Sequence, residues 1–282
     1  MDNNLNVRKL YIDTRYKLDT YGSNSKFTIE FPQTIECPEN TVMYVDEVVL
    51  PNTITTIQEG VNDDLYFVIY YGEQMYYHKT TLTERNYTLP AFADEVKTQL
   101  TLWMATDVGN FTTTVDVNRI TMTLRLTDTR RSQPDVLRWG ILTDEELKAG
   151  LFQNTKIPEP HTCNDILQNY FGKLSPLNLH ERNYDILYHV DLHTTRNLYL
   201  LADLGEFRTV TNFPWSGSSV LKKIQMNVPY NETLFFNVVM PYDCTHVGNM
   251  SFNRLNFHLV NSKGNYPNLR HNWSFSLIFD RQ

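Results

Sequence analysis

Apolar and polar residues alternate along most of this 282-residue chain, which is the pattern of β-strands buried on one face. The clearest example is the segment 26–31, in which every second side chain is apolar: Phe27, Ile29 and Phe31, against Lys26, Thr28 and Glu30. Residues 42–50 are apolar on both faces, so we expect that strand to be central or sandwiched. Pro51 cannot donate to a ladder and should end the strand, where Asn52 can start a turn.

The same alternation predicts further strands up to the end of the chain. Two pairs of them read as hairpins, 65–71 with 75–79 and 111–117 with 120–126. Later strands are predicted at 186–193, 197–202, 220–228, 234–240, 252–260 and 273–279. No repeat of fixed period is visible, and the connections vary in length, which favours a Greek-key β-sandwich over a meander.

Helical patterns are confined to the middle of the chain. Pro90 suits a first helical position, and residues 91–104 carry apolar side chains at helical spacing. Thr143 and Glu146 form a capping box for a short helix, and a second short helix is predicted to start near Thr162, to carry Ile166, Leu167, Tyr170 and Phe171, and to stop at Gly172. Prolines interrupt the rest of 128–183, so we interpret that segment as an irregular insertion or long connection within a β domain.

Composition and charge narrow the possible functions. The formal net charge is −7 and the pI is about 5.6, which argues against a nucleic-acid partner because phosphate contacts need clustered Lys and Arg. The three cysteines, Cys37, Cys163 and Cys244, form neither a disulfide framework nor a zinc-ligand spacing. The first residues lack the pattern of a signal peptide, and we expect no membrane span because no apolar run reaches about 18 residues.

His189, Asp191 and His193 are the sharpest candidates for metal chemistry. On one continuous strand they would share a face, but residues i and i+4 then lie about 13 Å apart, because each residue rises about 3.3 Å. That separation is too long for two histidines to hold one ion. We therefore expect a polar row that faces solvent, with no metal ligand, and no His-x-His pattern of a cupin enzyme is present.

The other candidates have structural explanations. Ser216 and Ser218 lie in a Ser-Gly cluster without the Gly-x-Ser-x-Gly elbow, and Cys163 has only His161 nearby in sequence. The acidic pairs Asp63-Asp64, Asp94-Glu95 and Glu145-Glu146 fit a loop and two helix starts. Asp13, Arg15, Asn52 and Asp63 of the opening stretch are interpreted as turn and edge residues. We thus predict no catalytic, cofactor-binding or metal-binding residue and no cofactor.

Several segments together resemble one known family. The opening reads Leu-Tyr-Ile-Asp-Thr-Arg at 10–15, Lys-Phe-Thr-Ile-Glu-Phe-Pro at 26–32, Leu-Pro-Asn-Thr at 50–53 and Gly-Val-Asn-Asp at 60–63. Similar patterns follow at 87–90, 141–147, 220–224, 228–230, 255–264 and 273–279. This combination resembles the penton (minor capsid) proteins of Polinton/Maverick elements, adintoviruses and related virophage-like viruses. The chain departs from the family at Asn231, where a Gly is frequent, and Asn tolerates similar turn geometry.

The resemblance implies an all-β protein with one single jelly-roll domain over residues 1–282, carrying helical and loop insertions around 85–183. It further implies a structural protein that forms homopentamers at the fivefold vertices of an icosahedral shell, beside a double jelly-roll major capsid protein. Such a protein is part of the virion, is assembled inside the host cell and is not an enzyme. A host receptor cannot be identified from the sequence.

Two other readings stay open. One is an attachment or carbohydrate-binding β-sandwich, which would show an exposed aromatic patch or a calcium loop. The other is an enzyme built on a jelly roll, for which no acid–base or metal constellation is found.

Two structural expectations test the predicted fold. Strand 273–279 should pair antiparallel with strand 27–31, as the last and first long strands of the sandwich, and their lying in separate sheets would overturn the predicted fold. Phe27, Ile29, Phe31, Leu277 and either Trp273 or Phe275 should share one core.

Overall fold

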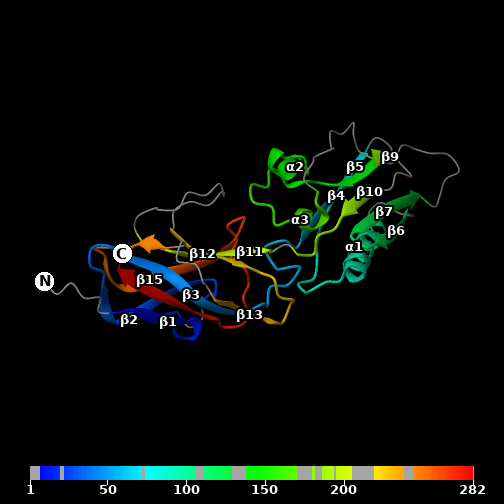
Figure 1. Cartoon of the computed structure of the whole chain (residues 1–282). Helices are drawn as coiled ribbons and strands as arrows, with labels where there is room; N and C mark the ends of the chain where they lie inside the picture. Colours follow the sequence, from blue (N-terminus) through cyan, green and yellow to red (C-terminus); the bar gives the residue numbers. More distant parts are fainter. Residues whose placement is uncertain are drawn as a thin grey trace. The chain divides into compact units, whose positions relative to one another are not determined.

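A computed structural model describes residues 7–19, 22–71, 74–105, 111–128, 138–169, 180–181, 186–193, 195–204, 219–237 and 244–281. The chain folds into two compact units (Figure 1). The first unit combines residues 1–54 with 195–282, and the second unit spans residues 55–194.

The first unit contains two antiparallel sheets. In sheet 1 the strand order is β1-β16-β3-β13, and the short strand β14 also pairs with β3. Its strands are β1 (Lys9–Asp13), β3 (Thr41–Pro51), β13 (Thr233–Asn237), β14 (Thr245–His246) and β16 (Ser274–Arg281). In sheet 2 the order is β12-β11-β15-β2. Its strands are β2 (Lys26–Glu36), β11 (Asn197–Ala202), β12 (Ser219–Gln225) and β15 (Ser251–Asn261).

The path of the chain through these sheets is that of a jelly roll. The chain changes sheet at every step between these strands except from β11 to β12, which are neighbours in sheet 2, and from β13 to β14, which both pair with β3. Counting β13 and β14 as one interrupted strand, eight strands form two four-stranded sheets, the double-sheet Greek-key arrangement of a jelly roll. The predicted all-β jelly-roll fold is confirmed.

The predicted pairing of the last strand was wrong. β16 pairs with β1 and β3 in sheet 1, whereas β2 pairs with β15 in sheet 2. The first strand of the jelly roll is β1, a five-residue strand that the sequence analysis did not identify. The last strand therefore pairs with the first strand, as in a jelly roll, but that first strand is β1 and not residues 27–31. The jelly-roll fold rests on the strand order of the two sheets, although the pairing chosen to test it was wrong.

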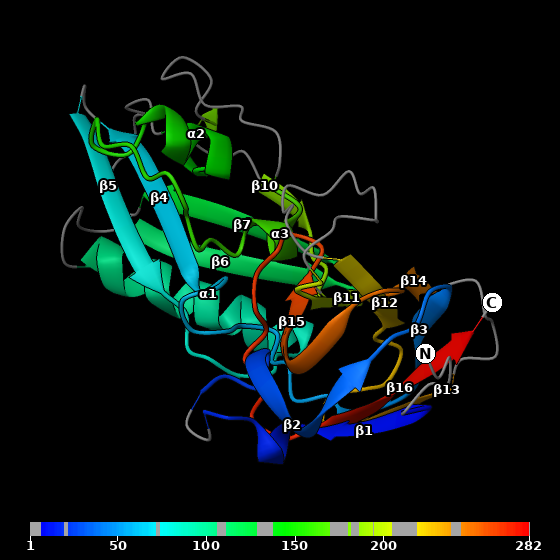
Figure 2. The same cartoon turned by 90° about the vertical axis from the view of Figure 1, so that its left-hand side faces the viewer.

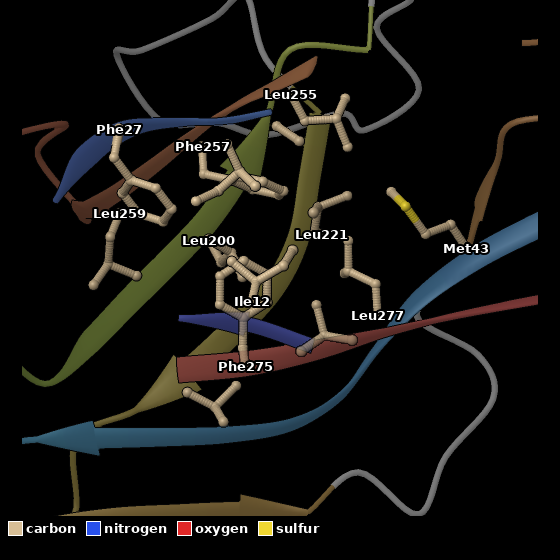
Figure 3. Close-up of a cluster of buried hydrophobic side chains, with 14 of the residues drawn as sticks. Ile12, Phe27, Met43, Leu200, Leu221, Leu255, Phe257, Leu259, Phe275 and Leu277 are labelled. Atoms are coloured by element: carbon tan, nitrogen blue, oxygen red, sulfur yellow. The ribbon is translucent and has the colours of Figure 1, made fainter. Parts of the chain in front are cut away.

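The predicted core of the sandwich is confirmed. Phe27, Ile29 and Phe31 pack with Trp273, Phe275 and Leu277 in one buried cluster drawn from both sheets (Figure 3). Phe257 of β15 lies at the centre of its aromatic part, with ring centroids 5.6 Å from Phe27 and 5.1 Å from Phe275. Aromatic pairs at such distances add to the burial of apolar area that holds the two sheets together.

The second unit has its own sheets and core. One sheet has the order β5-β4-β8-β9 and the other β10-β7-β6, and α1 lies alongside β6 (Figure 2). The strands are β4 (Asp64–Tyr71), β5 (Gln74–Thr81), β6 (Phe111–Asn118), β7 (Thr121–Asp128), β8 (Arg138–Ile141), β9 (His180–Glu181) and β10 (Ile186–His189). The helices are α1 (Leu89–Trp103), α2 (Asp144–Ala149) and α3 (Asn164–Leu167). None of the helices in the described ranges is long and apolar enough to cross a membrane.

The extent of the second unit differs from the expected insertion at 128–183. Its two hairpins, β4–β5 and β6–β7, pair only with other strands of the second unit among the described residues, so the inserted unit begins at Thr55 and ends at Thr194. The predicted insertions around 85–183 include β6–β7 but not β4–β5, because alternation identifies a strand but not its partner. The chain thus has one jelly roll interrupted between β3 and β11.

Predictions that depend on neighbouring residues, such as helix caps, were more accurate than predictions of strand pairing. Thr143 and Glu146 form the predicted capping box of α2, which ends at Gly150 with φ +89°. α3 is shorter than predicted because Gln168 adopts a left-handed conformation with φ 52° and ends the helix. The predicted continuation of α3 through 170–171 lies outside the described residues.

Candidate functional site

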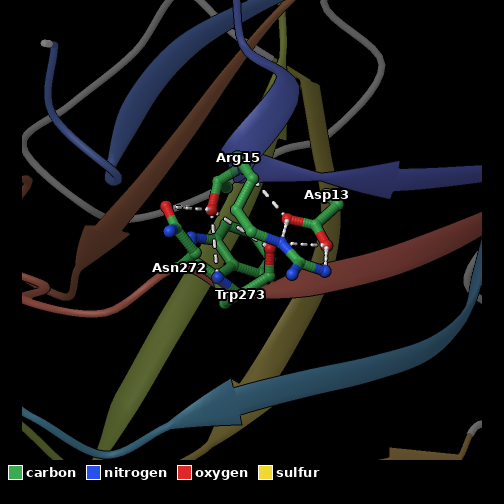
Figure 4. Close-up of polar contacts among 5 residues, drawn as sticks. Asp13, Arg15, Asn272 and Trp273 are labelled. Carbon is green, nitrogen blue, oxygen red and sulfur yellow. Dashed lines mark hydrogen bonds and ion pairs between the residues drawn. The ribbon is translucent and has the colours of Figure 1, made fainter. Parts of the chain in front are cut away.

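Three of the four polar residues singled out in the opening stretch lie in the first unit. Asp13 ends β1 and caps the 3-10 turn η1 (Thr14–Tyr16), accepting a hydrogen bond from the backbone N–H of Arg15 at 2.9 Å. The guanidinium of Arg15 bonds the same carboxylate through Nε, at 2.9 and 3.1 Å, and through one terminal nitrogen, at 2.5 Å (Figure 4). This hydrogen bonding lowers the pKa of Asp13.

The turn is also fastened to the start of β16. The backbone N–H of Thr14 donates to Trp273 O at 3.0 Å, and the backbone N–H of Trp273 donates back to Thr14 Oγ1 at 3.0 Å (Figure 4). The Thr14 hydroxyl lies 3.2 Å from Trp273 O and 3.4 Å from Asn272 Oδ1. Since Thr14 is fully buried, these contacts fix the turn to the sheet.

Asn52 has a comparable linking role at the end of β3. Its side chain donates to Val228 O at 2.8 Å, and its backbone exchanges hydrogen bonds with the turn at 231–232. Asn231, the departure from the family pattern, has φ +68° in this turn, a conformation that Asn tolerates. Asp63 lies in the second unit, where its carboxylate accepts a hydrogen bond from Gly60 N at 3.0 Å.

The outer face of sheet 1 is the most distinctive surface of the first unit. Directly paired residues form a row across four strands: Asp13, Ser274, Val49 and Phe235. A hollow of about 500 Å³ lies at this row, lined by residues that include Asp13, Arg15, Val49, Thr233 and Ser274. A second hollow of about 490 Å³ is lined by residues of β1 and β2, with Tyr11 and Tyr16 among them.

Large aromatic side chains of this part of the chain are exposed to solvent. Tyr11, Tyr16 and Phe235 are 72%, 78% and 73% exposed. Exposed aromatic side chains near a hollow are typical of binding surfaces. Asp13 and Arg15, which both line the first hollow, form an ion pair with each other. We therefore interpret the outer face of sheet 1 as a surface for binding a partner.

Tyr11, Tyr16 and Phe235 were not predicted as surface residues. Alternation alone would have placed Tyr11 and Phe235 outward, because their neighbours Leu10, Ile12, Leu234 and Phe236 pack against the core. Tyr16 lies in η1, where no period of two applies.

His189, Asp191 and His193 do not share one face of a strand as predicted, because only His189 lies in a strand. β10 ends at His189, and the N–H of Asp191 bonds Ile166 O of α3 instead of a neighbouring strand. Asp191 accepts a hydrogen bond from His193 N at 3.0 Å, which makes a local turn. In the described part of the chain, no three His, Cys, Asp or Glu side chains are placed to share a metal ion.

Two of the three cysteines, Cys37 and Cys163, are buried. Cys163 is fully buried at the start of α3, and burial raises the pKa of its thiol well above the ordinary value. Burial also raises the pKa of Cys37 to about 11. Both groups are therefore protonated thiols at neutral pH, not thiolates. Ser216 and Ser218 lie outside the described residues.

A polar network on the outer face of sheet 2 was also not predicted. His258 Nε2 lies 3.3 Å from Asp203 Oδ2, and His258 Nδ1 lies 3.1 Å from the hydroxyl of Tyr266. Asn256 joins it through bonds to Asp203 and Thr28. These residues are distant in sequence and meet only through strand pairing, so no local motif marks them. These residues contact one another, and their hydrogen bonds link β15 to the end of β11 and to the turn before β16.

Asp13 gives a first testable prediction. Its pKa is lowered in the fold from the ordinary value of 3.8, so its contribution to stability should be present above that value and be lost as pH falls through the folded pKa. At neutral pH, the free energy of unfolding of wild type should exceed that of Asp13→Asn by less than about 1 kcal/mol, because Arg15 is largely exposed to solvent. Urea titrations over a pH series measure the difference. If the difference in unfolding free energy stays constant down to pH values below the folded pKa, the stabilisation does not come from the ionised carboxylate of Asp13.

Comparisons with known proteins give matches among solved structures. No family model matches the chain, and no curated protein matches it. Among solved structures, the chain is similar to the crystal structure of selenomethionine-labelled mavirus penton protein, at 10% sequence identity and a TM-score of 0.49. The similarity covers 98% of this chain and 99% of that chain.

Proposed function

We propose that this protein is a structural capsid subunit of the penton type. The observation that carries the proposal is the strand order of the first unit, an eight-stranded jelly roll, which is an architecture used by viral capsid proteins. Because one fold serves many functions, the sequence resemblance to penton proteins supplies the specific assignment. The protein would form homopentamers at fivefold vertices, beside a double jelly-roll major capsid protein, within a virion assembled inside the host cell.

The surface chemistry supports assembly over catalysis. A closed ring of identical subunits uses two different side surfaces on each subunit, which meet head to tail. The outer face of sheet 1, with Tyr11, Val49 and Phe235, offers apolar area for one of them. A shell protein of this kind needs no nucleophile, metal or cofactor, so we propose that it is not an enzyme.

Native mass spectrometry of the full chain tests this function. We expect a species of five times the 33.1 kDa subunit mass, about 165 kDa. Electron micrographs of the same sample should show rings with fivefold symmetry. A stable trimer would contradict the penton assignment, and so would a chain that stays monomeric both alone and with its major capsid protein.

An attachment or carbohydrate-binding module is the second candidate, because the exposed rings of Tyr11, Tyr16 and Phe235 could stack on sugars. A glycan array separates the two functions. Glycan binding by a monomer, abolished by Tyr16→Ala, would favour the attachment module. Pentamers without glycan binding would favour the capsid subunit.

A further inference from the structure

Lys17 is an unusual residue in the loop between η1 and β2. It is only 6% exposed, although lysine is seldom buried. Its Nζ donates hydrogen bonds to Gly22 O at 2.5 Å and to Asn24 Oδ1 at 2.6 Å. Burial lowers the pKa of Lys17, an effect that the charge of Asp19 partly opposes. A larger share of this amine is therefore uncharged and nucleophilic than for an exposed lysine.

The side-chain amide of Asn24 is held in one orientation against this amine. Its Nδ2 donates to Leu269 O and to His271 O, both at 3.2 Å. Its backbone oxygen accepts a hydrogen bond from Trp273 Nε1 at 2.8 Å. Nζ therefore contacts two amide carbonyls, the backbone one of Gly22 and the side-chain one of Asn24, and only the side-chain amide can exchange its nitrogen without cutting the chain.

We propose that Lys17 and Asn24 are the site of an intramolecular isopeptide bond that forms spontaneously in the folded protein. Uncharged Nζ attacks Asn24 Cγ, the new Nζ–Cγ bond forms, and the Cγ–Nδ2 bond breaks. One proton passes from Nζ to Nδ2, which leaves as ammonia. The reaction exchanges one amide for another without oxidation or reduction, so it needs no further reactant.

The surrounding contacts favour each part of this exchange. Fixing the amine at the amide replaces a collision between free molecules by a reaction within one structure, which is a large entropic advantage. The two carbonyl oxygens of Leu269 and His271 face Nδ2 and stabilise the positive charge that develops as it takes up a proton. The new amide N–H can keep the hydrogen bond to Gly22 O.

The bond would link residues 17 and 24 covalently, and the hydrogen bond from Trp273 Nε1 to the backbone oxygen of Asn24 would remain, whereas the two bonds donated by Nδ2 are lost with the ammonia. This inference does not depend on the proposed capsid function, because it rests only on contacts within one subunit.

Peptide mapping by mass spectrometry of the purified full chain tests it. Trypsin cuts unmodified protein after Arg15, Lys17 and Lys26, which gives peptide 18–26. With the isopeptide bond, trypsin cannot cut after Lys17, and we expect peptide 16–26 instead, lighter by one ammonia than its sequence. Loss of ammonia from Asn24 as a succinimide gives the same mass change but leaves the cut after Lys17 intact, so the two products are distinguishable.

Variants provide the controls. Lys17→Arg keeps the charge and Asn24→Ala removes the electrophile, and intact masses of both should equal those calculated from sequence. Unmodified peptide 18–26 from a folded wild-type sample, incubated at neutral and at alkaline pH, would overturn the proposal. Since wild type decides the outcome, a variant that fails to fold does not affect the test.

Discussion

Replacing Phe257 by Ala should lower the free energy of unfolding of the first unit by about 3–5 kcal/mol. Phe257 is completely buried between the two sheets and contacts the rings of Phe27 and Phe275 (Figure 3). The truncation removes apolar area and leaves a cavity, because three neighbouring strands fix its surroundings. Chemical denaturation followed by circular dichroism and tryptophan fluorescence measures the loss, and Trp273 reports on this unit.

Phe235→Ala is the matched control for this experiment. The same atoms are removed from a strand of the same unit, but Phe235 is 73% exposed on the outer face of sheet 1. We expect a change within about 0.5 kcal/mol for the isolated subunit. Equal losses from the two variants would mean that Phe257 does not lie in the core as described.

Leu100→Ala should destabilise the second unit by about 2–5 kcal/mol. Leu100 is fully buried on the inner face of α1, in the core that α1 shares with β4 and β7. Thermal and chemical unfolding of the full chain measure the effect. The buried clusters of the two units have no member in common, so we expect the transition of the second unit to move while that of the first unit stays in place.

Leu102→Ala is a close control because it lies on the same helix, two residues away, and is 59% exposed. Both variants change helix propensity by the same small amount, so the difference between them isolates burial. A loss of several kcal/mol from Leu102→Ala, or movement of both transitions by Leu100→Ala, would contradict the division into two cores.

The fold was predictable from sequence where the signal is local. Alternation identified the faces of residues 27–31 and 275–279, and the capping box identified α2, because each depends on neighbours within a few residues. Strand partners were not predictable in this way. β1 is too short to show a clear period, and the hairpins β4–β5 and β6–β7 have the same pattern whether they belong to the jelly roll or to an inserted unit.

The candidate site was predictable only in part. Asp13, Arg15 and Asn52 lie in turns at strand ends, as their residue types indicate, because Asp and Asn bond nearby backbone groups. The outward position of Phe235 follows from its alternation with Leu234 and Phe236, but its exposure requires that the outer face of sheet 1 stay uncovered, which no spacing encodes. The contact of Lys17 with Asn24 depends on the shape of a loop and is not encoded by a spacing either.

The interruption of the jelly roll between β3 and β11 bears on how the chain matures during synthesis. Among the described strands, β1, β2 and β3 pair with none of one another; their partners are β13 to β16, encoded more than 180 residues later. The ribosome therefore delivers all strands of the second unit before the first sheet of the sandwich can close. Strand pairs that are this far apart in sequence form slowly, and their apolar strands stay unpaired until the partners are synthesised. We therefore expect chaperones to bind the amino-terminal segment during synthesis. A chain terminated early would keep a complete second unit and no jelly roll.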